Sequence, residues 1–223
     1  MEAPLAPGST SGFKRDSPVR AGLFFSPGSA AGLHLKVPFL VLCLATLLCA
    51  CASQSVARQS LWNALSQGGY VLLMPPASAP DDETRRTPEL PKRCAEKDSL
   101  SEQGHIDAHR LKRELQGHAV AAGRVLTGSD CRCVVTAGVV FGRAEPWSII
   151  DDAGNDDART RRDKVRALRE AISRWKSEEN LALVTHRSNI RDALGVDVQP
   201  GEILVIQPMG DAGYNLLGRL TVY

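Results

Sequence analysis

The sequence lacks an excess of charge of either sign. It has 27 Lys and Arg residues against 25 Asp and Glu residues, a formal net charge of +2. The small surplus lies before Cys51, and from Cys51 onward basic and acidic residues balance. Because nucleic-acid-binding domains usually carry a clear basic surplus, we expect no nucleic-acid partner.

A long hydrophobic run is also missing. The uncharged stretch Val37–Cys51 follows Lys36, and its length of about 15 residues is short for a membrane span. It suits the hydrophobic region of a signal peptide. Its end, Leu48–Cys51, resembles the bacterial lipobox, in which the final cysteine is acylated and becomes the new N-terminus. We therefore expect an exported, periplasmic lipoprotein anchored through Cys51, with a plain cleaved signal or an uncleaved anchor as alternatives.

The whole chain of 223 residues has the composition of one folded domain, or of one domain plus a tail, since 43% of its residues are hydrophobic and 23% are charged. Residues 1–36 are rich in Gly, Pro and Ser. Either a disordered leader or a start site assigned too far upstream explains them. We divide the rest into the signal region 37–51, a polar linker 52–59 and a domain over 60–223.

Cysteines are few in the expected domain, which contains Cys94, Cys131 and Cys133. An oxidising periplasm favours a disulfide between Cys94 and either Cys131 or Cys133. A zinc site is the rival interpretation, but one Cys-x-Cys pair without a second pair supports it weakly. We therefore expect a disulfide and no metal or cofactor.

The first half of the domain contains signals for both strands and helices. A short helix ending at Gly68 and Gly69 precedes a strand over Tyr70–Met74, and a long loop over 77–98 follows. A capping box over Ser99–Glu102 predicts the start of the next helix. Its apolar face is expected at Ala108, Leu111, Leu115 and Ala119, with Gly123 as its stop and a strand after it.

The second half continues the alternation. We expect a helix over about Cys131–Phe141, and then an acidic loop that caps a helix with Val165, Leu168, Ile172 and Trp175 on one face. The stretch "NLALVTH" is apolar enough for a central strand, and "GEILVIQP" and "YNLLGRLTVY" supply two more. This order indicates an α/β sandwich whose last strand is an antiparallel edge.

Five stretches come in a recognisable order: "GGYVLLMPPAS", "LSEQGHIDAHRL", "LTGSDCRCVVTA", "LALVTHRSNIRDALG" and "GEILVIQP". Their order and approximate spacing resemble the histidine phosphatase superfamily, in the branch that includes the phosphoglycerate-mutase-like enzymes. The resemblance covers about residues 60–223. It implies a three-layer αβα sandwich with a doubly wound, mostly parallel sheet and an active site at the strand ends.

The resemblance also implies residue roles. In the family an Arg-His pair ends the first strand, and this His attacks phosphorus while the Arg binds the phosphoryl oxygens. A second Arg precedes a Thr-Ala pair, where this chain has Arg132, and a second His ends a later strand, where it has His186. Phosphoryl transfer needs such fixed cations and an in-line nucleophile. Glu145 or Asp151 stands in the region that supplies the family's proton donor.

The departure from the family lies at Pro75 and Pro76, which occupy the Arg and nucleophilic His positions. Proline offers neither a nucleophilic lone pair nor a positive charge, so the covalent step is not available there. His105, His109 and His118 belong to a helical segment where side chains face solvent or pack. Arg132 and His186 would then form a weak pocket for phosphate or a phosphorylated small molecule.

Three functional hypotheses follow. The first is a catalytically degenerate envelope lipoprotein with a residual anion pocket at Arg132 and His186. The second is a phosphohydrolase that activates water with these two residues and forms no covalent intermediate. The third is a structural envelope protein without a ligand, in which His186 is satisfied by a backbone hydrogen bond and Arg132 pairs with Asp130 or the acidic loop.

Overall fold

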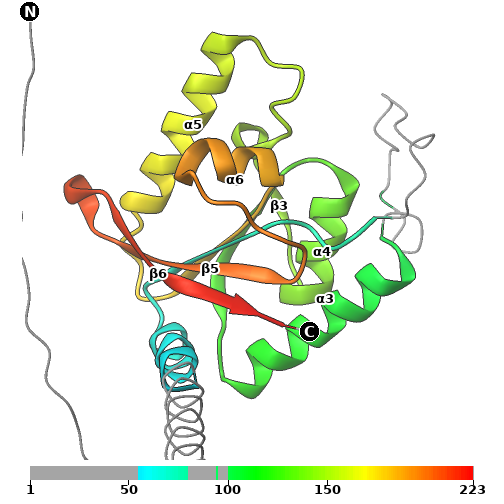
Figure 1. The fold of residues 1–223 in the computed structure, drawn as a ribbon, viewed down its shortest axis with the longest axis vertical. Helices are drawn as coiled ribbons and strands as arrows, with labels where there is room; N and C mark the ends of the chain where they lie inside the picture. The colour runs from blue at the N-terminus through cyan, green and yellow to red at the C-terminus, as the bar shows by residue number, and fades with distance from the viewer. Residues whose placement is uncertain (1–54, 80–93, 95–99, 223) are drawn as a thin grey trace, which may run out of the picture. The chain divides into compact units, whose positions relative to one another are not determined.

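A six-stranded sheet forms the centre of the domain (Figure 1). The computed structural model describes residues 55–79, 94 and 100–222, all within one compact unit. The strand order across the sheet is β3-β2-β4-β1-β5-β6. The strands are β1 (Val71–Met74), β2 (Ala122–Thr127), β3 (Glu145–Pro146), β4 (Asn180–Val184), β5 (Glu202–Pro208) and β6 (Tyr214–Thr221).

Most of the sheet is parallel. β2 pairs in parallel with β3 and β4, and β4 pairs in parallel with β1. β5 is antiparallel to β1, and β6 is antiparallel to β5. The expected antiparallel edge is confirmed at β6. The strand that runs against all the others is β5, since two successive antiparallel pairings return β6 to the common direction.

Helices cover both faces of the sheet (Figure 1). The helix over residues 55–67, α3 (Glu102–Gly117) and α4 (Cys131–Phe141) share one hydrophobic core with Leu72 and Met74 of β1. α5 (Ala158–Ser173) and α6 (Arg187–Leu194) share a second core with Val71 and Leu73. Successive strand residues point to opposite faces, so β1 serves both cores. The expected three-layer sandwich is confirmed.

The central strand β4 is buried along its whole length, as its apolar sequence predicts. Its first residue, Asn180, is 1% exposed. The Asn180 side-chain amide donates to the carbonyl oxygens of Leu65 and Ala121 at 2.7 and 2.8 Å, and its oxygen accepts from Tyr70 N at 3.1 Å. One polar side chain therefore joins the starts of β1, β2 and β4.

The start of α3 differs from the expectation. Its N-cap is Ser101, not Ser99, which lies outside the described residues. Ser101 Oγ accepts from Gly104 N at 3.0 Å, and both Ser101 N and Ser101 Oγ donate to the Ser78 carbonyl oxygen. The helix start is thus selected by a contact with the segment after β1, which the local sequence does not reveal.

The end of α3 was also predicted wrongly. The helix stops at Gly117, and Ala119 is exposed with a left-handed φ of 55° instead of lying on the apolar face. The His118 ring stacks on Trp62 with centroids 4.3 Å apart. Gly123, expected as the helix stop, lies inside β2 at a register shift between Ala122 and Arg124, which both pair with β4.

The linker expected over 52–59 is helical from residue 55. Gln59 is a good helix former, and its amide donates to Asn63 Oδ1 one turn later at 3.0 Å. Gly68 and Gly69, with φ of 79° and 85°, end this helix as predicted. The leader, the signal region and Cys51 lie outside the described residues. Among the residues that are described, no helix has the length and apolar character needed to cross a bilayer.

The expectations for the other helices are largely confirmed. α4 has the expected bounds, and Asp157 of the acidic loop caps α5 by accepting from the backbone N–H groups of Arg159 and Thr160. Leu168 and Ile172 are buried. Trp175 lies beyond the end of α5, where its indole N–H donates to the Glu179 carbonyl oxygen. The helix therefore stops two residues earlier than its apolar pattern suggests.

Candidate functional site

Three parallel strands end at the same edge of the sheet. Val184 of β4 pairs with Met74 of β1 on one side and Thr127 of β2 on the other. The register continues past the strands, because Thr185 N donates to the Met74 carbonyl oxygen and Gly128 N donates to that of Val184. The segments after β1, β2 and β4 therefore meet, and they carry the candidate residues Pro75, Pro76, Arg132 and His186.

Pro75 and Pro76 follow β1 directly and are both buried. Met74 is the last residue of β1 with a ladder partner, so the missing N–H groups of the prolines cost no ladder hydrogen bond. The next N–H, of Ala77, donates to Thr136 Oγ1 of α4 at 3.0 Å. The segment is thus held against α4, with apolar rings where the family pattern has a cation and a nucleophile.

Arg132 lies in the first turn of α4, next to the N-cap residue Asp130. Asp130 Oδ1 accepts from Arg132 N at 2.9 Å and from Arg132 Nε at 3.2 Å. Both side chains are about two-fifths exposed. The guanidinium that was expected to bind an anion is therefore paired with a carboxylate of its own turn.

His186 follows β4 and occupies the N-cap position of α6 without a capping hydrogen bond from its side chain. It is only 9% exposed, and its Nε2 is buried without a hydrogen-bond partner among the described residues. Burial is the largest effect on the His186 pKa and lowers it. Asp152, Asp130 and Asp151 oppose this shift, and Arg132 reinforces it. The imidazole is therefore neutral at pH 7, with a lone pair available.

Cys133 of α4 lies close to Asp130 and His186 at the same edge of the sheet. Its neighbour Cys131 forms a disulfide with Cys94, one of the two pairings that the sequence left open, and Cys133 is a free buried thiol. Residues two apart project to nearly opposite sides of a helix, which separates the two cysteines. Burial raises the pKa of the Cys133 thiol, and the carboxylate of Asp130 raises it further.

Asp130, Cys133 and His186 form a group of metal-ligand type. One potential ligand atom from each lies within 4.8 Å of the other two. In the described part of the chain, no other three His, Cys, Asp or Glu residues meet in this way.

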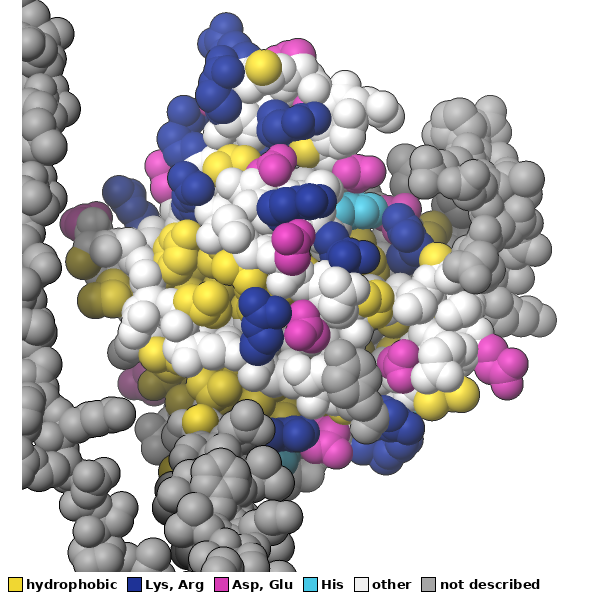
Figure 2. All heavy atoms as spheres, viewed as in Figure 1, with side chains coloured by type: hydrophobic (Ala, Val, Ile, Leu, Met, Phe, Trp, Pro, Cys, Tyr) yellow, Lys and Arg dark blue, Asp and Glu magenta, His cyan; other side chains and the backbone are white. Residues whose placement is uncertain are grey.

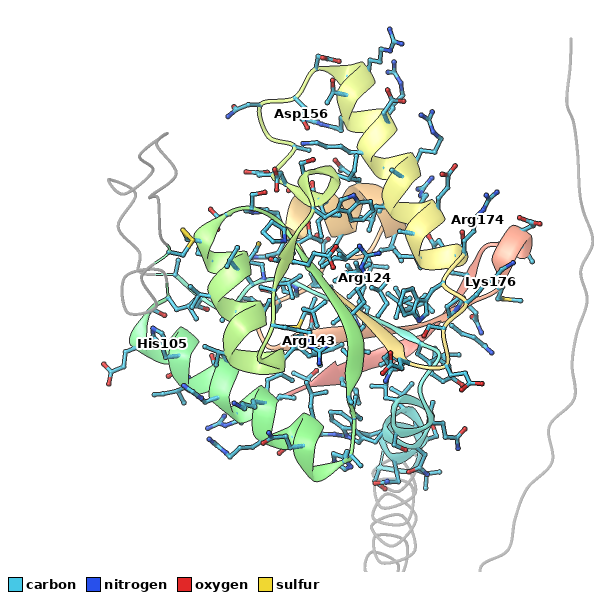
Figure 3. The ribbon with its side chains drawn as sticks, turned by 180° about the vertical axis from the view of Figure 1, so that it is seen from behind. His105, Arg124, Arg143, Asp156, Arg174 and Lys176 are labelled. Atoms are coloured by element: carbon cyan, nitrogen blue, oxygen red, sulfur yellow. A yellow bond between two sulfur atoms is a disulfide. The ribbon has the colours of Figure 1, made fainter. Side chains whose placement is uncertain are left out.

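The two candidate proton donors lie in different places. Asp151 is at the site, where its Oδ1 accepts from Ser129 N at 2.6 Å. Glu145 is on the exposed strand β3 and makes a two-pronged ion pair with Arg124 of β2, which is labelled in Figure 3. This pair lowers the Glu145 pKa. A general acid needs a raised pKa, which excludes Glu145. Asp151 is the candidate that lies at the site.

Asn189 of α6 holds the acidic loop next to the segment that carries His186. Its side-chain amide donates to the carbonyl oxygens of Ile150 and Asp151 at 3.0 and 2.9 Å, and to Thr185 Oγ1 at 2.9 Å. Thr185 Oγ1 itself donates to the Ile150 carbonyl oxygen. The loop that carries Asp151 and Asp152 is thus tied to the segment that carries His186.

The other histidines among the described residues, which all lie in or directly after α3, do not belong to this group. His109 is exposed on α3, and His118 stacks on Trp62. His105 lies in the first turns of α3 and is labelled in Figure 3. None of these three histidines joins the group of Asp130, Cys133 and His186.

A groove of about 750 Å³ lies elsewhere, over α5. Figure 2 shows Lys and Arg side chains gathered on this helix. The groove is separate from the strand-end site. Its lining includes Arg161, Arg162, Arg166, Arg169, Asp192 and Tyr214.

The doubly wound sheet is the architecture that the resemblance implied, and the comparison with solved structures agrees with this fold. Bacillus stearothermophilus YhfR is 13% identical, with 66% of this chain and 94% of that chain covered and a TM-score of 0.51. An Escherichia coli protein assigned as an alpha-ribazole-5'-P phosphatase is 14% identical, with 69% and 96% covered and a TM-score of 0.50.

The protein histidine phosphatase SixA, in complex with tungstate, has a TM-score of 0.48 at 13% identity, with 68% of this chain and 96% of that chain covered. No protein-family model and no curated protein matches the sequence. The chain has the fold of the histidine phosphatase superfamily, which confirms the expected resemblance. At these identities the likeness concerns the fold alone.

Sequence reasoning missed three parts of the site: the position of Cys133 beside His186, the approach of Asp152, and the anchoring role of Asn189. The first had a usable signal, because a Cys-x-Cys pair on a helix cannot point both thiols at one partner. The other two depend on how the acidic loop folds back onto α6, for which no local pattern exists.

Proposed function

We propose that this chain is a catalytically degenerate protein with the histidine phosphatase fold, exported and held at an envelope membrane by a lipid on Cys51. The observation that carries the degeneracy is the pair of buried prolines after β1. The register of β1 with β4 sets them at the same edge as His186. A covalent phosphohistidine cannot form at proline.

Among the described residues at this edge, neither Cys133 nor Asp151 is a suitable replacement nucleophile. A thiol attacks as thiolate, and the raised pKa of Cys133 keeps it protonated at neutral pH. Asp151 Oδ1 is engaged by Ser129 N. His186 has a free lone pair, which favours the water-activating hydrolase as the second candidate function.

The local charges also oppose a tightly bound phosphate. Asp130, Asp151 and Asp152 act on His186 together with a single guanidinium, that of Arg132. Asp130 already pairs with this guanidinium. We therefore infer that the residual anion pocket at Arg132 and His186 binds phosphate weakly at most, and that a neutral His186 adds little to it.

The test is hydrolysis of an aryl phosphate by the purified full-length protein. We expect no turnover above the uncatalysed rate. Turnover that disappears in His186→Ala would overturn the proposal in favour of the second candidate, and an acid-labile phosphoenzyme would point to a covalent mechanism. NMR titration with phosphate separates weak anion binding from a ligand-free structural role, because only binding shifts the resonances of Arg132 and His186.

A gain-of-function variant tests the same point from the other side. Pro75→Arg with Pro76→His restores the two family residues on a scaffold that keeps Arg132 and His186. Measurable phosphatase activity in this variant alone would locate the missing function at the two prolines. The matched control adds His186→Ala to the double variant and should remove the activity.

The anchor rests on the sequence of residues 37–51, and its test is separate. Intact-mass measurement of the protein purified from membranes should give a chain that begins at an acylated Cys51. The Cys51→Ser variant should lack the acyl mass and leave the membrane fraction. A wild-type chain with an unmodified terminus would contradict the lipoprotein proposal and leave the degeneracy proposal standing.

A further inference from the structure

The buried Nε2 of His186 has no partner among the described residues. Buried polar side-chain atoms in native proteins nearly always have a hydrogen-bond partner, and an exception calls for a water, an ion or a functional role. His105 Nε2 is also buried without a partner. The two differ in their neighbours, because only His186 has a thiol and a carboxylate of other residues within 4.8 Å of its ligand atom.

We propose that Asp130, Cys133 and His186 bind a divalent transition-metal ion of the zinc class through a carboxylate oxygen, a thiolate sulfur and an imidazole nitrogen. Zinc takes these three donor types with bonds of about 2.0 to 2.3 Å, so two ligand atoms of one tetrahedral ion lie about 3.3 to 3.8 Å apart. From separations of up to 4.8 Å, the side chains need to draw together by only about 1 Å. A thiolate and an imidazole favour zinc-like ions over magnesium and calcium.

The ligands are held in place for such an ion. Asp130 is fixed by two hydrogen bonds from Arg132, to its backbone N–H and its Nε, and ligating carboxylates are commonly oriented in this way. Cys133 and His186 are buried on rigid elements, α4 and the junction of β4 with α6. Arg132 would thus serve the site by orienting Asp130.

The charge of the corner favours a cation. Three carboxylates and one guanidinium act on both Cys133 and His186: those of Asp130, Asp151 and Asp152, and that of Arg132. Among these described groups the negative charges outnumber the positive one, so they repel an anion and attract a divalent cation. The half-exposed Asp130 lies on the open side of the group, so an ion can enter past it and leave a water as fourth ligand.

Binding includes one proton transfer. The Cys133 thiol gives its proton to solvent as its sulfur forms the metal bond, so one metal ion enters and one proton leaves. The His186 imidazole binds in its neutral form and releases none. Asp130 binds as a carboxylate. No electron is transferred, and no co-reactant is needed.

This inference goes beyond the proposed function, and the two can fail separately. If the chain binds Zn²⁺ and hydrolyses phosphate esters only when loaded, the degeneracy proposal falls and the metal site stands. If it neither binds Zn²⁺ nor turns over a phosphate ester, the metal site falls and the degeneracy proposal stands.

The experiment titrates the full-length protein, with its disulfide intact, with Co²⁺ and with Zn²⁺ against a competing chelator. We expect one ion per chain and, with Co²⁺, a near-ultraviolet charge-transfer band from thiolate to metal. Cys133→Ala should abolish the band and weaken Zn²⁺ binding by about 100-fold or more, since even changes outside the ligand set cost about 10- to 100-fold.

Two further variants keep the test decisive if Cys133→Ala folds poorly. Asp130→Asn retains a good N-cap residue but removes a charged ligand, and should weaken Zn²⁺ binding at least about tenfold. His105→Ala removes a histidine with an equally unpaired nitrogen outside the group and should leave the affinity unchanged. The absence of a charge-transfer band in the wild type, or equal Zn²⁺ affinity in folded Cys133→Ala or Asp130→Asn, would overturn the proposal.

Discussion

Gly104 of α3 lies against the backbone of the segment that follows β1. A Cβ built on Gly104 would lie 2.1 Å from the Ser78 carbonyl oxygen, where only backbone could move to make room. The same oxygen accepts hydrogen bonds from Ser101 N at 2.9 Å and Ser101 Oγ at 3.2 Å. Gly104→Ala must therefore push α3 away from the residues just after Pro75 and Pro76.

The cost of Gly104→Ala can be estimated from these contacts. Overpacking of this kind costs about 1 to 3 kcal/mol, and the loss of two hydrogen bonds about 1 kcal/mol each. Alanine is about 1 kcal/mol more favourable than glycine in a helix and offsets part of the loss. We expect the free energy of unfolding to fall by about 2 to 4 kcal/mol.

Urea unfolding followed by circular dichroism measures this change, and Gly117→Ala is its matched control. Gly117 ends the same helix, and a Cβ there meets no atom within 4 Å. We expect this variant to be neutral or more stable by up to about 1 kcal/mol. Equal effects of the two substitutions would refute the reasoning, because helix propensity alone would then explain both.

Three further predictions concern the disulfide between Cys94 and Cys131, the hydrogen bonds of Asn180 and the pKa of His186. Cys94→Ser with Cys131→Ser should lower the free energy of unfolding by about 4 kcal/mol, because the bridge spans 37 residues; urea unfolding measures it, and no change would mean that the bridge does not form. Asn180→Ala should cost about 3 kcal/mol in the same assay, since it leaves Tyr70 N and the Ala121 carbonyl oxygen unpaired and removes one of the two donors to the Leu65 carbonyl oxygen; a loss below about 1 kcal/mol would mean that water replaces the lost partners. The lowered His186 pKa means that the unfolded state binds the proton at a higher pH. The contribution of His186 to the free energy of unfolding is therefore fully present above about pH 6.5, and it decreases as the pH falls below this value. The urea midpoint should fall less steeply with acidification in His186→Gln, and parallel curves would contradict this.

The elements that the sequence predicted well are those whose signal is local. α4 is delimited by Asp130, whose side chain caps the first turn, and by Gly142 in a left-handed conformation after the last. β4 is apolar throughout because both of its faces are covered. Such features depend on a few neighbouring residues, so their pattern survives without knowledge of the fold.

The errors at α3 have the opposite origin. Two serines could cap this helix, and the choice of Ser101 depends on the Ser78 carbonyl oxygen, 23 residues away in the chain. The helix ends at Gly117, and the next residue, His118, stacks its ring on Trp62 of the first helix. Distant partners decide both boundaries, and no local pattern encodes them.

For the site, the sequence by itself determined that Pro75 and Pro76 stand where the resemblance implies an Arg and a nucleophilic His, and proline supplies neither a positive charge nor a nucleophilic lone pair in any conformation. The resemblance implied an active site at the strand ends, and the structure brings the segments after β1, β2 and β4 together there. Only the tertiary structure decided which side chains of these segments pair with one another and which are buried. It pairs Arg132 with Asp130, buries the Cys133 thiol beside an unpaired His186 nitrogen, and folds two more carboxylates over them. Burial and the sum of nearby charges are properties of distances between elements, and these distances are set by packing.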